Sequence, residues 1–425
     1  MTAADRYQLN LGMGLDSVSI LTRWIREPHT RDFDLNRLTV VTAMTGDEYA
    51  ATENAMTRFV LPLLRAHGIR YVQIGRAGQS DADGYIVLDD SRNPMQMHMA
   101  GPWRLSEELT AAGTIPTTAG PRWCSARAKG IPLDLFAARE YSAPHAPDWP
   151  PSCRLTHQQS FHCAVGFAAE EPARAADDRA SSARRTPARR PFYPLLEQWG
   201  WDRHDCADYL TRAFGIQWPR SCCTYCPYAG GSRRKNAEVA ARWAAEPDAG
   251  ARAIALEYAS LALHPQMKLF KTVSAAEVAR QQHLTTVLDR AGELLTRQSW
   301  ALYQVRRVIR RAGDALVDDD TIALGPDPSA KGHHWRSIRA LARGTARDMQ
   351  TLVRQATLGG RCEVGADGIE RRWKHRRDDR HFPDLEELYV AAPAGVHDKQ
   401  RGRFEQVWQH APAYRAAAPG ARAAA

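Results

Sequence analysis

Two short stretches carry residue types whose spacing could do chemistry, and the first is a glycine turn at residues 12–17. It lies between an apolar run at residues 7–11 and a run with helical spacing at residues 18–25. A tight turn between a strand and a helix presents backbone N–H groups and the positive helix end to an anion. Gly12 and Gly14 carry no Cβ, so a phosphate can approach the main chain closely. The turn predicts a phosphate site, to which Ser17 adds a hydroxyl donor and where Asp16 caps the helix or orients a metal ion or water.

The second stretch is a cysteine segment at residues 221–228. Cys223 and Cys226 form a Cys-x-x-Cys pair, a spacing that lets two thiolates converge on one metal ion and that also suits a redox dithiol. Cys222, next to this pair, and Cys124, about a hundred residues earlier, are candidates to complete a four-thiolate site. The residues leave three alternatives open, which are an iron–sulfur cluster, a zinc ion and no metal. The other four cysteines have no partner at ligand spacing and read as buried or surface thiols: Cys153, Cys163, Cys206 and Cys362.

Strands and helices alternate through the first part of the chain and could position these groups. The runs at residues 38–43 and 71–74 read as buried strands, and residues 52–66 between them have helical apolar spacing. This alternation predicts a parallel sheet, whose ligands bind outside the carboxyl ends of the strands. Residues 12–17 and 45–48 both follow a strand, so we expect them at one edge of the sheet.

The glycine turn resembles the PP-loop of the ATP pyrophosphatases and of the phosphoadenosine phosphosulfate (PAPS) reductase family. Gly12, Gly14, Asp16 and Ser17 match the loop pattern, and Leu15 stands where many members carry a lysine. A Thr-Gly-x-Glu-like stretch near the nucleotide is matched by Thr45, Gly46 and Glu48. The resemblance implies an α/β fold: a parallel-sheet, adenine nucleotide alpha-hydrolase-like (HUP or Rossmann-like) domain.

Two later segments extend the resemblance. In the first, Arg122, Arg127 and Lys129 match basic positions that face the anionic end of the nucleotide in the family, although a basic helix start in water would look the same. They could supply the charge that Leu15 lacks. The second segment follows a short apolar run at residues 164–167, which reads as a strand. Its residues Gly166, Glu171 and Arg174 match the family pattern, whereas Ala168 and Pro172 depart from it.

The cysteines also resemble those of the iron–sulfur members of the family, where two separate regions ligate one [4Fe–4S] cluster. Cys124 lies in the first region and Cys222, Cys223 and Cys226 lie in the second. The family's tandem pair falls in the first region, whereas here it falls in the second. Reductases with a C-terminal catalytic cysteine carry a Glu-Cys-Gly-x-His segment, which the surroundings of Cys362 do not match. This difference weakens the case for sulfonucleotide reduction.

The second part of the chain reads as a helical region. We expect a nucleotide domain at residues 1–232, a helical C-terminal region at residues 233–410 with helices at 236–245, 249–263, 275–295 and 300–312, and a disordered tail at residues 411–425. Residues 173–190 are rich in Ala, Arg and Ser and are expected to form a loop. The basic run at residues 371–377 is expected to be a solvated helix face or a contact to a phosphate backbone.

Composition limits the function classes. With 44% apolar and 25% charged residues, the chain has the composition of an ordinary globular protein. No apolar run is long enough to span a bilayer and the first residues have no signal-peptide pattern, so we expect a cytoplasmic protein without a membrane partner. The formal charge of +9 is compatible with a nucleic-acid partner.

The resemblance implies an enzyme of sulfur metabolism or nucleotide activation that acts on an adenine nucleotide, either ATP or PAPS/APS. Its cofactors would be Mg²⁺ for the ATP reaction and a [4Fe–4S] cluster or, as the alternative, Zn²⁺. A DNA- or tRNA-modifying sulfur transferase and a non-catalytic nucleotide-binding protein of phage or defence systems are the rival functions. The implied catalytic residues are Asp16, Arg127 and Lys129. The implied nucleotide-binding residues are Gly12, Met13, Gly14, Asp16, Ser17, Thr45, Gly46, Glu48, Arg122, Gly166, Glu171 and Arg174. The implied metal ligands are Cys124, Cys222, Cys223 and Cys226.

Overall fold

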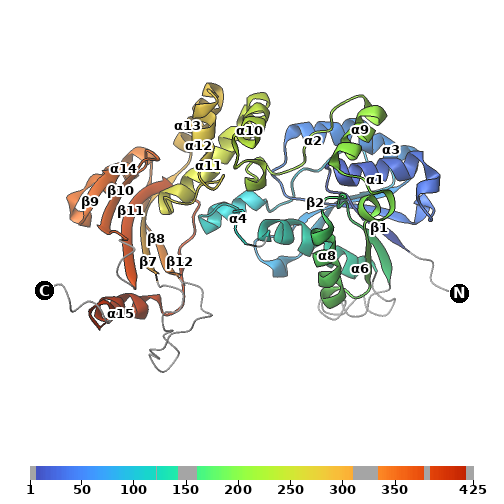
Figure 1. Cartoon of the computed structure of the whole chain (residues 1–425). Helices are drawn as coiled ribbons and strands as arrows, with labels where there is room; N and C mark the ends of the chain where they lie inside the picture. Colours follow the sequence, from blue (N-terminus) through green and yellow to red (C-terminus); the bar gives the residue numbers. More distant parts are fainter. Residues whose placement is uncertain (1–5, 121, 142–159, 310–333, 378–382, 418–425) are drawn as a thin grey trace. The chain divides into compact units, whose positions relative to one another are not determined.

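The computed structural model describes residues 6–120, 122–141, 160–309, 334–377 and 383–417. The chain divides into two compact units (Figure 1). Unit 1 contains residues 1–108 and 117–229, and unit 2 contains residues 109–116 and 230–425. The sequence placed a boundary after residue 232, and it gave no sign that residues 109–116 belong with the second unit. Cys153 lies outside the described residues.

Unit 1 is an α/β structure built on a mixed, mostly parallel six-stranded sheet in the order β4-β3-β2-β1-β5-β6. Neighbouring strands run parallel except for the antiparallel pair β3 and β4. The strands are β1 (Tyr7–Asn10), β2 (Leu38–Met44), β3 (Arg70–Arg76), β4 (Tyr85–Ser91), β5 (Phe161–Ala164) and β6 (Arg189–Phe192). Because β1 is followed in the chain by β2 on one side and flanked by β5 on the other, its carboxyl end lies where the strand order reverses, which is where open α/β sheets bind ligands.

Helices connect these strands and cover both faces of the sheet. The helices are α1 (Leu15–Arg26), α2 (Ala50–Ala55), α3 (Leu61–Ala66), α4 (Leu105–Ala112), α5 (Trp123–Ser125), α6 (Ile131–Glu140), α8 (Pro172–Arg185) and α9 (Arg203–Phe214). The short helical turns are η1 (Pro28–Thr30), η2 (Leu35–Arg37), η3 (Met56–Val60), η4 (Asp81–Asp83), η5 (Ala126–Gly130), η6 (Pro194–Trp199) and η7 (Pro227–Ala229). The second half of α4 belongs to unit 2.

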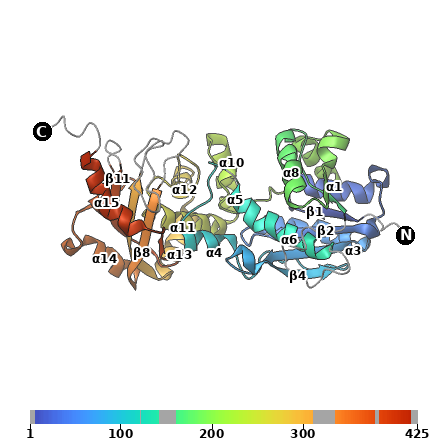
Figure 2. The same ribbon diagram turned by 90° about the horizontal axis from the view of Figure 1, so that it is seen from below.

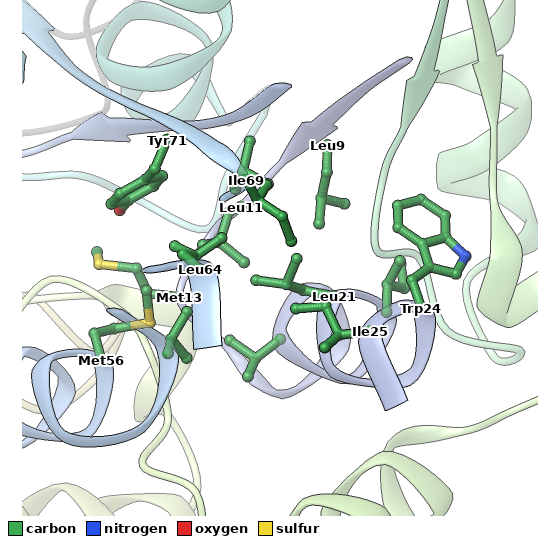
Figure 3. Packing of buried hydrophobic residues seen from close by; sticks show 14 of the residues in the cluster. Leu9, Leu11, Met13, Leu21, Trp24, Ile25, Met56, Leu64, Ile69 and Tyr71 are labelled. Atoms are coloured by element: carbon green, nitrogen blue, oxygen red, sulfur yellow. The ribbon is translucent and has the colours of Figure 1, made fainter. Parts of the chain in front are cut away.

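The main core of unit 1 lies between the sheet and α1. Figure 3 shows Leu9 of β1 facing Leu21 and Trp24 of α1, and Met56 and Leu64 extend the same cluster. The i, i+3, i+4 spacing of apolar residues that predicted this helix is what places its buried side chains in one stripe. The core therefore fixes the start of α1, and with it the glycine turn, against the end of β1.

The opposite face of the sheet is covered by α6 and α8, as Figures 1 and 2 show for this unit. Phe136 of α6 packs on Val41 and Ala43 of β2. Ala175 of α8 packs with Phe167 and Tyr193. The prediction of a loop over residues 173–190 was wrong, because residues 172–185 form the helix α8. The strand expected at residues 164–167 ends at Ala164, so Gly166 follows the strand.

Unit 2 contains a second six-stranded sheet in the order β12-β8-β7-β11-β10-β9, and every strand pair in it is antiparallel. Its strands are β7 (Trp300–Ile309), β8 (His334–Gly344), β9 (Arg361–Val364), β10 (Glu370–His375), β11 (Asp384–Pro393) and β12 (Lys399–Gln400). Its helices are α10 (Arg233–Ala245), α11 (Pro247–Leu263), α12 (Ala275–Gln281), α13 (Thr285–Arg297), α14 (Ala346–Arg354), α15 (Phe404–Ala417) and the turn η8 (Ala356–Leu358).

Helices cover both faces of the second sheet. Leu261 and Leu263 of α11 pack on Tyr303 and Leu388 on one face. Met349 and Val353 of α14 pack on the opposite face, together with other apolar residues of β7 and β11. In the described part of the chain, no helix is both long and apolar enough to cross a membrane.

The prediction of a helical C-terminal region was correct only as far as residue 297. Residues 300–309, expected to be a helix, form the central strand β7, and the basic run that begins at Arg371 lies largely in β10. The expected helix at 275–295 is interrupted between α12 and α13. The tail expected to be disordered begins inside α15, which continues to Ala417, and residues 418–425 lie outside the described residues.

Candidate functional site

The glycine turn keeps an unusual backbone conformation. Met13 has a φ of 63°, a left-handed value that non-glycine residues rarely adopt. Its side chain is fully buried in the main core, and its carbonyl oxygen accepts a hydrogen bond of 2.9 Å from Trp218 Nε1. Because the side chain and the carbonyl are both fixed, Met13 holds the turn in a strained shape that its neighbours support. Met13 therefore has a positioning role in this turn.

Two serines hold the turn from either side. The Gly12 N–H donates to Ser17 Oγ at 3.0 Å, and the Ser221 hydroxyl donates to the Gly12 carbonyl at 2.7 Å. Gly14 caps α1 with an extended backbone, and among the described residues no capping side chain accepts from the N–H groups of the first helical turn. These N–H groups therefore lack the partner that a capping side chain usually supplies. Ser17 accepts from the Gly12 N–H, and its hydroxyl lies 3.5 Å from the Gly14 carbonyl, so its donation to a ligand stays a prediction.

The turn opens into a cavity of about 820 Å³ that lies wholly within unit 1. Its floor is formed by Asn10 of β1, by Leu11 directly after it, and by Val41 and Ala43 of β2, and its sides are formed by α5, η5, α6 and α8. Eight residues predicted from the sequence line it: Gly12, Gly14, Asp16, Ser17, Arg122, Lys129, Gly166 and Arg174. Residues far apart in the sequence thus meet around one cavity, at the edge where the parallel sheet predicts a ligand.

The three glycines of this cavity differ in what a side chain would meet. A Cβ at Gly12 would have Ser17 Oγ as its nearest neighbour at 3.8 Å, and one at Gly14 would have Ser221 Cβ at 3.6 Å, which are ordinary contacts. A Cβ at Gly166 would lie 2.9 Å from the backbone nitrogen of Ser17, which is too close. Gly166 is therefore required by the packing of the protein against the turn. Gly12 and Gly14 are not, so their bare backbone leaves room for something outside the protein.

Asp16 lies at the cavity among charged groups. Burial raises the pKa of its carboxyl to about 6, although the nearby Arg203 guanidinium acts in the opposite direction. Its Oδ1 atom is buried and makes no hydrogen bond within the described part of the chain, and its Oδ2 atom is 3.8 Å from Arg203 Nε. Arg203 also forms an ion pair of 2.7 Å with Glu171, which pairs with Arg174 at 2.5 Å. Glu171 thus positions the two arginines beside the cavity.

Lys129 supplies a cation to the opposite wall. Its Nζ atom is 3.4 Å from Glu48 Oε1, which in turn lies 3.2 Å from Ser221 Oγ. Burial acts to lower the pKa of Lys129, but the Glu48 carboxylate outweighs it and leaves the pKa above its ordinary value. Lys129 is therefore charged, and Glu48 connects it through Ser221 to the glycine turn.

The other two basic residues of this segment behave differently. Arg122 lines the cavity, and its guanidinium lies over the Tyr228 ring, 4.2 Å from the centroid. Arg127 does not line it: its guanidinium pairs with Glu108 and lies 3.2 Å from Asp81. Arg127 and Lys129 are two residues apart in a helical turn, so they point in different directions. Arg127 therefore lies outside the cavity lining, and its action on a nucleotide stays a prediction.

Thr45 and Gly46 contact other segments of unit 1 and are absent from the cavity lining among the described residues. Thr45 Oγ1 lies 3.5 Å from Cys223 Sγ, and Gly46 has a φ of 88° against the side chain of Arg104. Next to them, Asp47 accepts from the Tyr225 hydroxyl at 2.6 Å. This stretch therefore holds the cysteine segment in place, and of its predicted site residues only Glu48 contacts a cavity residue.

The cysteine segment lies against the same stretch. Cys223 forms a backbone bridge with Glu48, and its thiol is buried, which raises its pKa. A hydrogen bond with the Cys222 thiol lowers the pKa of Cys226, whereas burial raises that of Cys124. Within the described ranges, no group of three or more His, Cys, Asp or Glu side chains is arranged to hold a metal ion. The four-cysteine site therefore stays a prediction.

On the α8 side of the cavity, sequence reasoning predicted Arg174 and missed the other charged residues. Arg189 lines it, forms a two-pronged ion pair of 3.0 Å with Asp178, and is joined there by the Tyr193 hydroxyl at 2.9 Å from the same carboxylate. Asp134 of α6 faces this pair, and burial raises its pKa. The signal that could have revealed α8 is the seven-residue spacing of its buried Ala175 and Ser182, which is two helical turns.

Comparisons with known protein families, with curated proteins and with solved structures returned no match.

Proposed function

We propose that unit 1 binds an adenine nucleotide in the 820 Å³ cavity, with its phosphates at the glycine turn, as a PP-loop enzyme with an adenine nucleotide alpha-hydrolase-like (HUP or Rossmann-like) fold would. One observation carries the proposal. Gly12 and Gly14 line the cavity beside an uncapped helix start, and the protein itself would accept a methyl group at either position. A bare backbone and unpaired N–H groups are what a phosphate needs.

The charges around the cavity support an anionic ligand. Lys129 and Arg122 lie on one wall and Arg174 on another. They would neutralise the phosphates and stabilise the charge that develops on them during reaction. Leu15 occupies the position where the resembled loop carries a lysine, so Lys129 would supply that charge from a different segment.

The reaction that fits best is activation of an acceptor by ATP. An oxygen of the acceptor attacks the α-phosphorus, the bond to the β-phosphate oxygen breaks, and pyrophosphate leaves with the electron pair. A second nucleophile then displaces AMP from the adenylated acceptor. Sulfur transfer from PAPS or APS would use the same phosphate contacts and is the alternative that the assay below distinguishes.

The structure supports the two predicted metal cofactors, Mg²⁺ and the metal of the cysteine segment, to different degrees. Asp16 has a buried carboxylate oxygen without a hydrogen bond in the described part of the chain, which fits a group that holds Mg²⁺ next to bound phosphates. There Mg²⁺ would neutralise phosphate charge. The cysteine thiols do not form a ready metal site among the described residues, so no step is derived through a [4Fe–4S] cluster or Zn²⁺.

The first test is direct measurement of binding and turnover. The full chain is purified without oxygen, its iron, zinc and sulfide are measured, and it is incubated with Mg²⁺ and either ATP or PAPS. AMP and pyrophosphate from ATP would support adenylation, whereas sulfite from PAPS would support the sulfonucleotide alternative. Binding of ATP without either product would reduce the proposal to a nucleotide-binding role.

The second test separates the turn from the rest of the fold. Gly14 has a φ of −88°, which any residue adopts, so Gly14→Val should fold normally. Its side chain would occupy the place of a phosphate and weaken ATP binding by about tenfold or more, equivalent to about 1.4 kcal/mol. Gly292→Ala, in a helix of unit 2 with no atom within 4 Å of the added Cβ, is the matched control. Unchanged ATP affinity in a folded Gly14→Val protein would refute the phosphate site.

A further inference from the structure

The net charge of the chain is confined to one of its two units. Unit 2 has 32 Lys and Arg against 23 Asp and Glu, which gives a formal charge of +9, whereas unit 1 has 25 of each. The cavity of unit 1 therefore belongs to a unit that is neutral overall. An excess of this size on a separate unit is the kind of charge distribution that polyanion-binding proteins show.

Within unit 2, three cations come together on one face of the antiparallel sheet. Arg307 of β7 lies directly opposite Arg336 of β8 in the strand register. Lys399 of β12 lies opposite Ile338, and residues two apart on a strand share a face, so Lys399 and Arg336 are diagonal neighbours. We call Arg307, Arg336 and Lys399 the cation cluster. Like charges placed directly opposite each other in a sheet are unfavourable.

The described part of the chain offers this cluster a single carboxylate. Glu386 lies opposite Arg307 in the register and pairs with its guanidinium, which also donates to the Leu263 carbonyl. The Lys399 ammonium donates to a backbone carbonyl. For Arg336, the described residues provide no side-chain hydrogen bond or ion pair.

Burial adds to the unfavourable balance of charge. It lowers the pKa of Lys399 to about 8, and the charges of Arg336 and Arg307 act in the same direction. Burial and the facing Arg307 also lower the pKa of Arg336. Arg307, which is almost fully buried, has Glu386 as its partner, whereas Arg336 and Lys399 have no carboxylate partner among the described residues. A bound anion would reduce the repulsion and give Arg336 a partner.

A further basic side chain lies near the other end of β8. Arg343 lies opposite Ala301 and Arg336 opposite Arg307, so the two arginines share a face. Their partners are six residues apart on β7, a distance of about 20 Å. Tyr303 and Ile338, which lie between them on this face, are buried against α11, so Arg343 and the cluster would contact separate phosphates on either side of that packed region. Arg343 is exposed and donates to the Ala394 carbonyl, which leaves its charge without a carboxylate partner among the described residues.

We propose that the cation cluster and Arg343 bind the phosphate backbone of a nucleic acid. A phosphodiester carries the charge that the cluster lacks, and a guanidinium binds its oxygens through two parallel hydrogen bonds. Contacts of this kind position a strand without reading its sequence. The proposal goes beyond the nucleotide site of unit 1 and does not depend on it.

The test compares two variants with the same change in net charge. Arg336→Gln/Lys399→Gln removes two charges from the cluster, and Arg297→Gln/Arg361→Gln removes two exposed charges that pair with neighbouring acids elsewhere in unit 2. Fluorescence anisotropy follows binding of the full chain to labelled single-stranded RNA, single-stranded DNA and duplex DNA. The salt concentration is varied from about 50 to about 300 mM, because contacts to phosphates weaken steeply over this range.

The wild-type chain should bind at low salt. The cluster variant should bind about tenfold or more weakly, and the slope of log affinity against log salt should fall by about 1.4 to 1.8, the value expected for two lost phosphate contacts. The control variant should change affinity by less than about threefold. The cluster variant should also keep its thermal unfolding temperature, because it removes unpaired like charges; if it does not fold, Arg343→Gln replaces it.

Three results would overturn the proposal. They are absence of binding at 50 mM salt, equal losses in the two double variants, and displacement of the nucleic acid by free ATP at concentrations that saturate unit 1. The Gly14→Val chain should bind nucleic acid normally, which separates failure of this proposal from failure of the nucleotide site. A chain that binds inorganic phosphate but none of the oligonucleotides would have a small-anion site, and this result would also count against the proposal.

Discussion

The two units of this chain treat their charged residues in opposite ways. Unit 1 has as many acids as bases, and several of the charges around its cavity are paired, as Arg203 is with Glu171 and Arg189 with Asp178. Unit 2 carries the whole excess of +9, yet several of its arginines are buried. The excess positive charge belongs to unit 2, whereas the cavity predicted from motifs belongs to unit 1. The net charge of the chain is therefore no evidence for or against a ligand in that cavity.

Buried arginines in unit 2 also have a structural use. Arg371 is only 1% exposed, donates to the Leu261 and Ala262 carbonyls at the end of α11, and pairs with Asp367 at 2.6 Å. Arg307 donates to the next carbonyl, Leu263. Two guanidinium groups therefore satisfy the last carbonyls of a helix, where positive charge is favourable. In unit 1, by contrast, the helix end that lacks partners is a helix start facing a cavity.

The largest expected effect follows from Arg371. Arg371→Met removes the charge that pairs with Asp367 and the donors to the Leu261 and Ala262 carbonyls at a buried position, so unit 2 should lose about 3–5 kcal/mol of unfolding free energy. Denaturant unfolding followed by hydrogen exchange of α11 measures this loss. ATP binding by unit 1 should be kept, and Arg361→Met, an exposed arginine, is the control. If Arg371→Met lowered the stability of unit 2 and also abolished ATP binding by unit 1, the two units would not unfold separately.

The next effect concerns Gly166. Gly166→Ala places a Cβ 2.9 Å from the Ser17 nitrogen, so the glycine turn must shift. We expect a loss of about 1–3 kcal/mol in stability, as for other overpacked sites, and ATP binding weaker by about tenfold. Gly14→Val should reduce ATP binding only. If Gly166→Ala left both quantities unchanged, the close packing of this residue against the turn would not matter for the site.

The sequence predicted the glycine turn, the first three strands and the helices between them, because each has a regular apolar period bounded by turn residues. It failed at β7, whose residues 300–309 are buried on both faces and so show no alternation between apolar and polar positions. The sequence also contained no indication that Arg371 is buried, because an arginine that binds helix carbonyls in the interior cannot be distinguished by sequence from one in solvent.

Among the site residues predicted from the sequence, Gly14, Lys129 and Gly166 line one cavity, whereas Arg127 lies outside its lining. The direction of a side chain within a helical turn depends on where the turn lies, and here Glu108 and Asp81 hold Arg127 away from the cavity. Apart from Arg174, the α8 wall was missed because its composition is that of a loop. Sequence patterns therefore identified the backbone of the site better than its side walls.

The smallest expected effect is a pH dependence of nucleotide binding that comes from Asp16. Its pKa is about 6, against an ordinary value of 3.8, so the carboxylate is ionised at pH 7.5 and repels a phosphate at the turn. Protonation between pH 7.5 and 5.5 should remove this repulsion and strengthen binding of ATP without Mg²⁺ by about three- to tenfold. Arg203, Arg174, Glu170 and Glu171 face the same carboxylate and set the size of the effect.

Asp16→Asn separates this effect from the titration of the nucleotide itself, because both proteins bind the same ligand. The variant should bind Mg²⁺-free ATP more tightly at pH 7.5 and match the wild type near pH 5.5. Since a raised carboxyl pKa costs stability above that pKa, Asn should also raise the unfolding free energy at pH 7.5 by about 1–3 kcal/mol, a gain that fades as the pH falls from about 6 toward 3.8. Asp177→Asn, an exposed carboxylate on the same cavity, is the control and should leave the pH profile unchanged. Parallel profiles for wild type and Asp16→Asn would place the phosphates away from Asp16, and with it away from the start of α1.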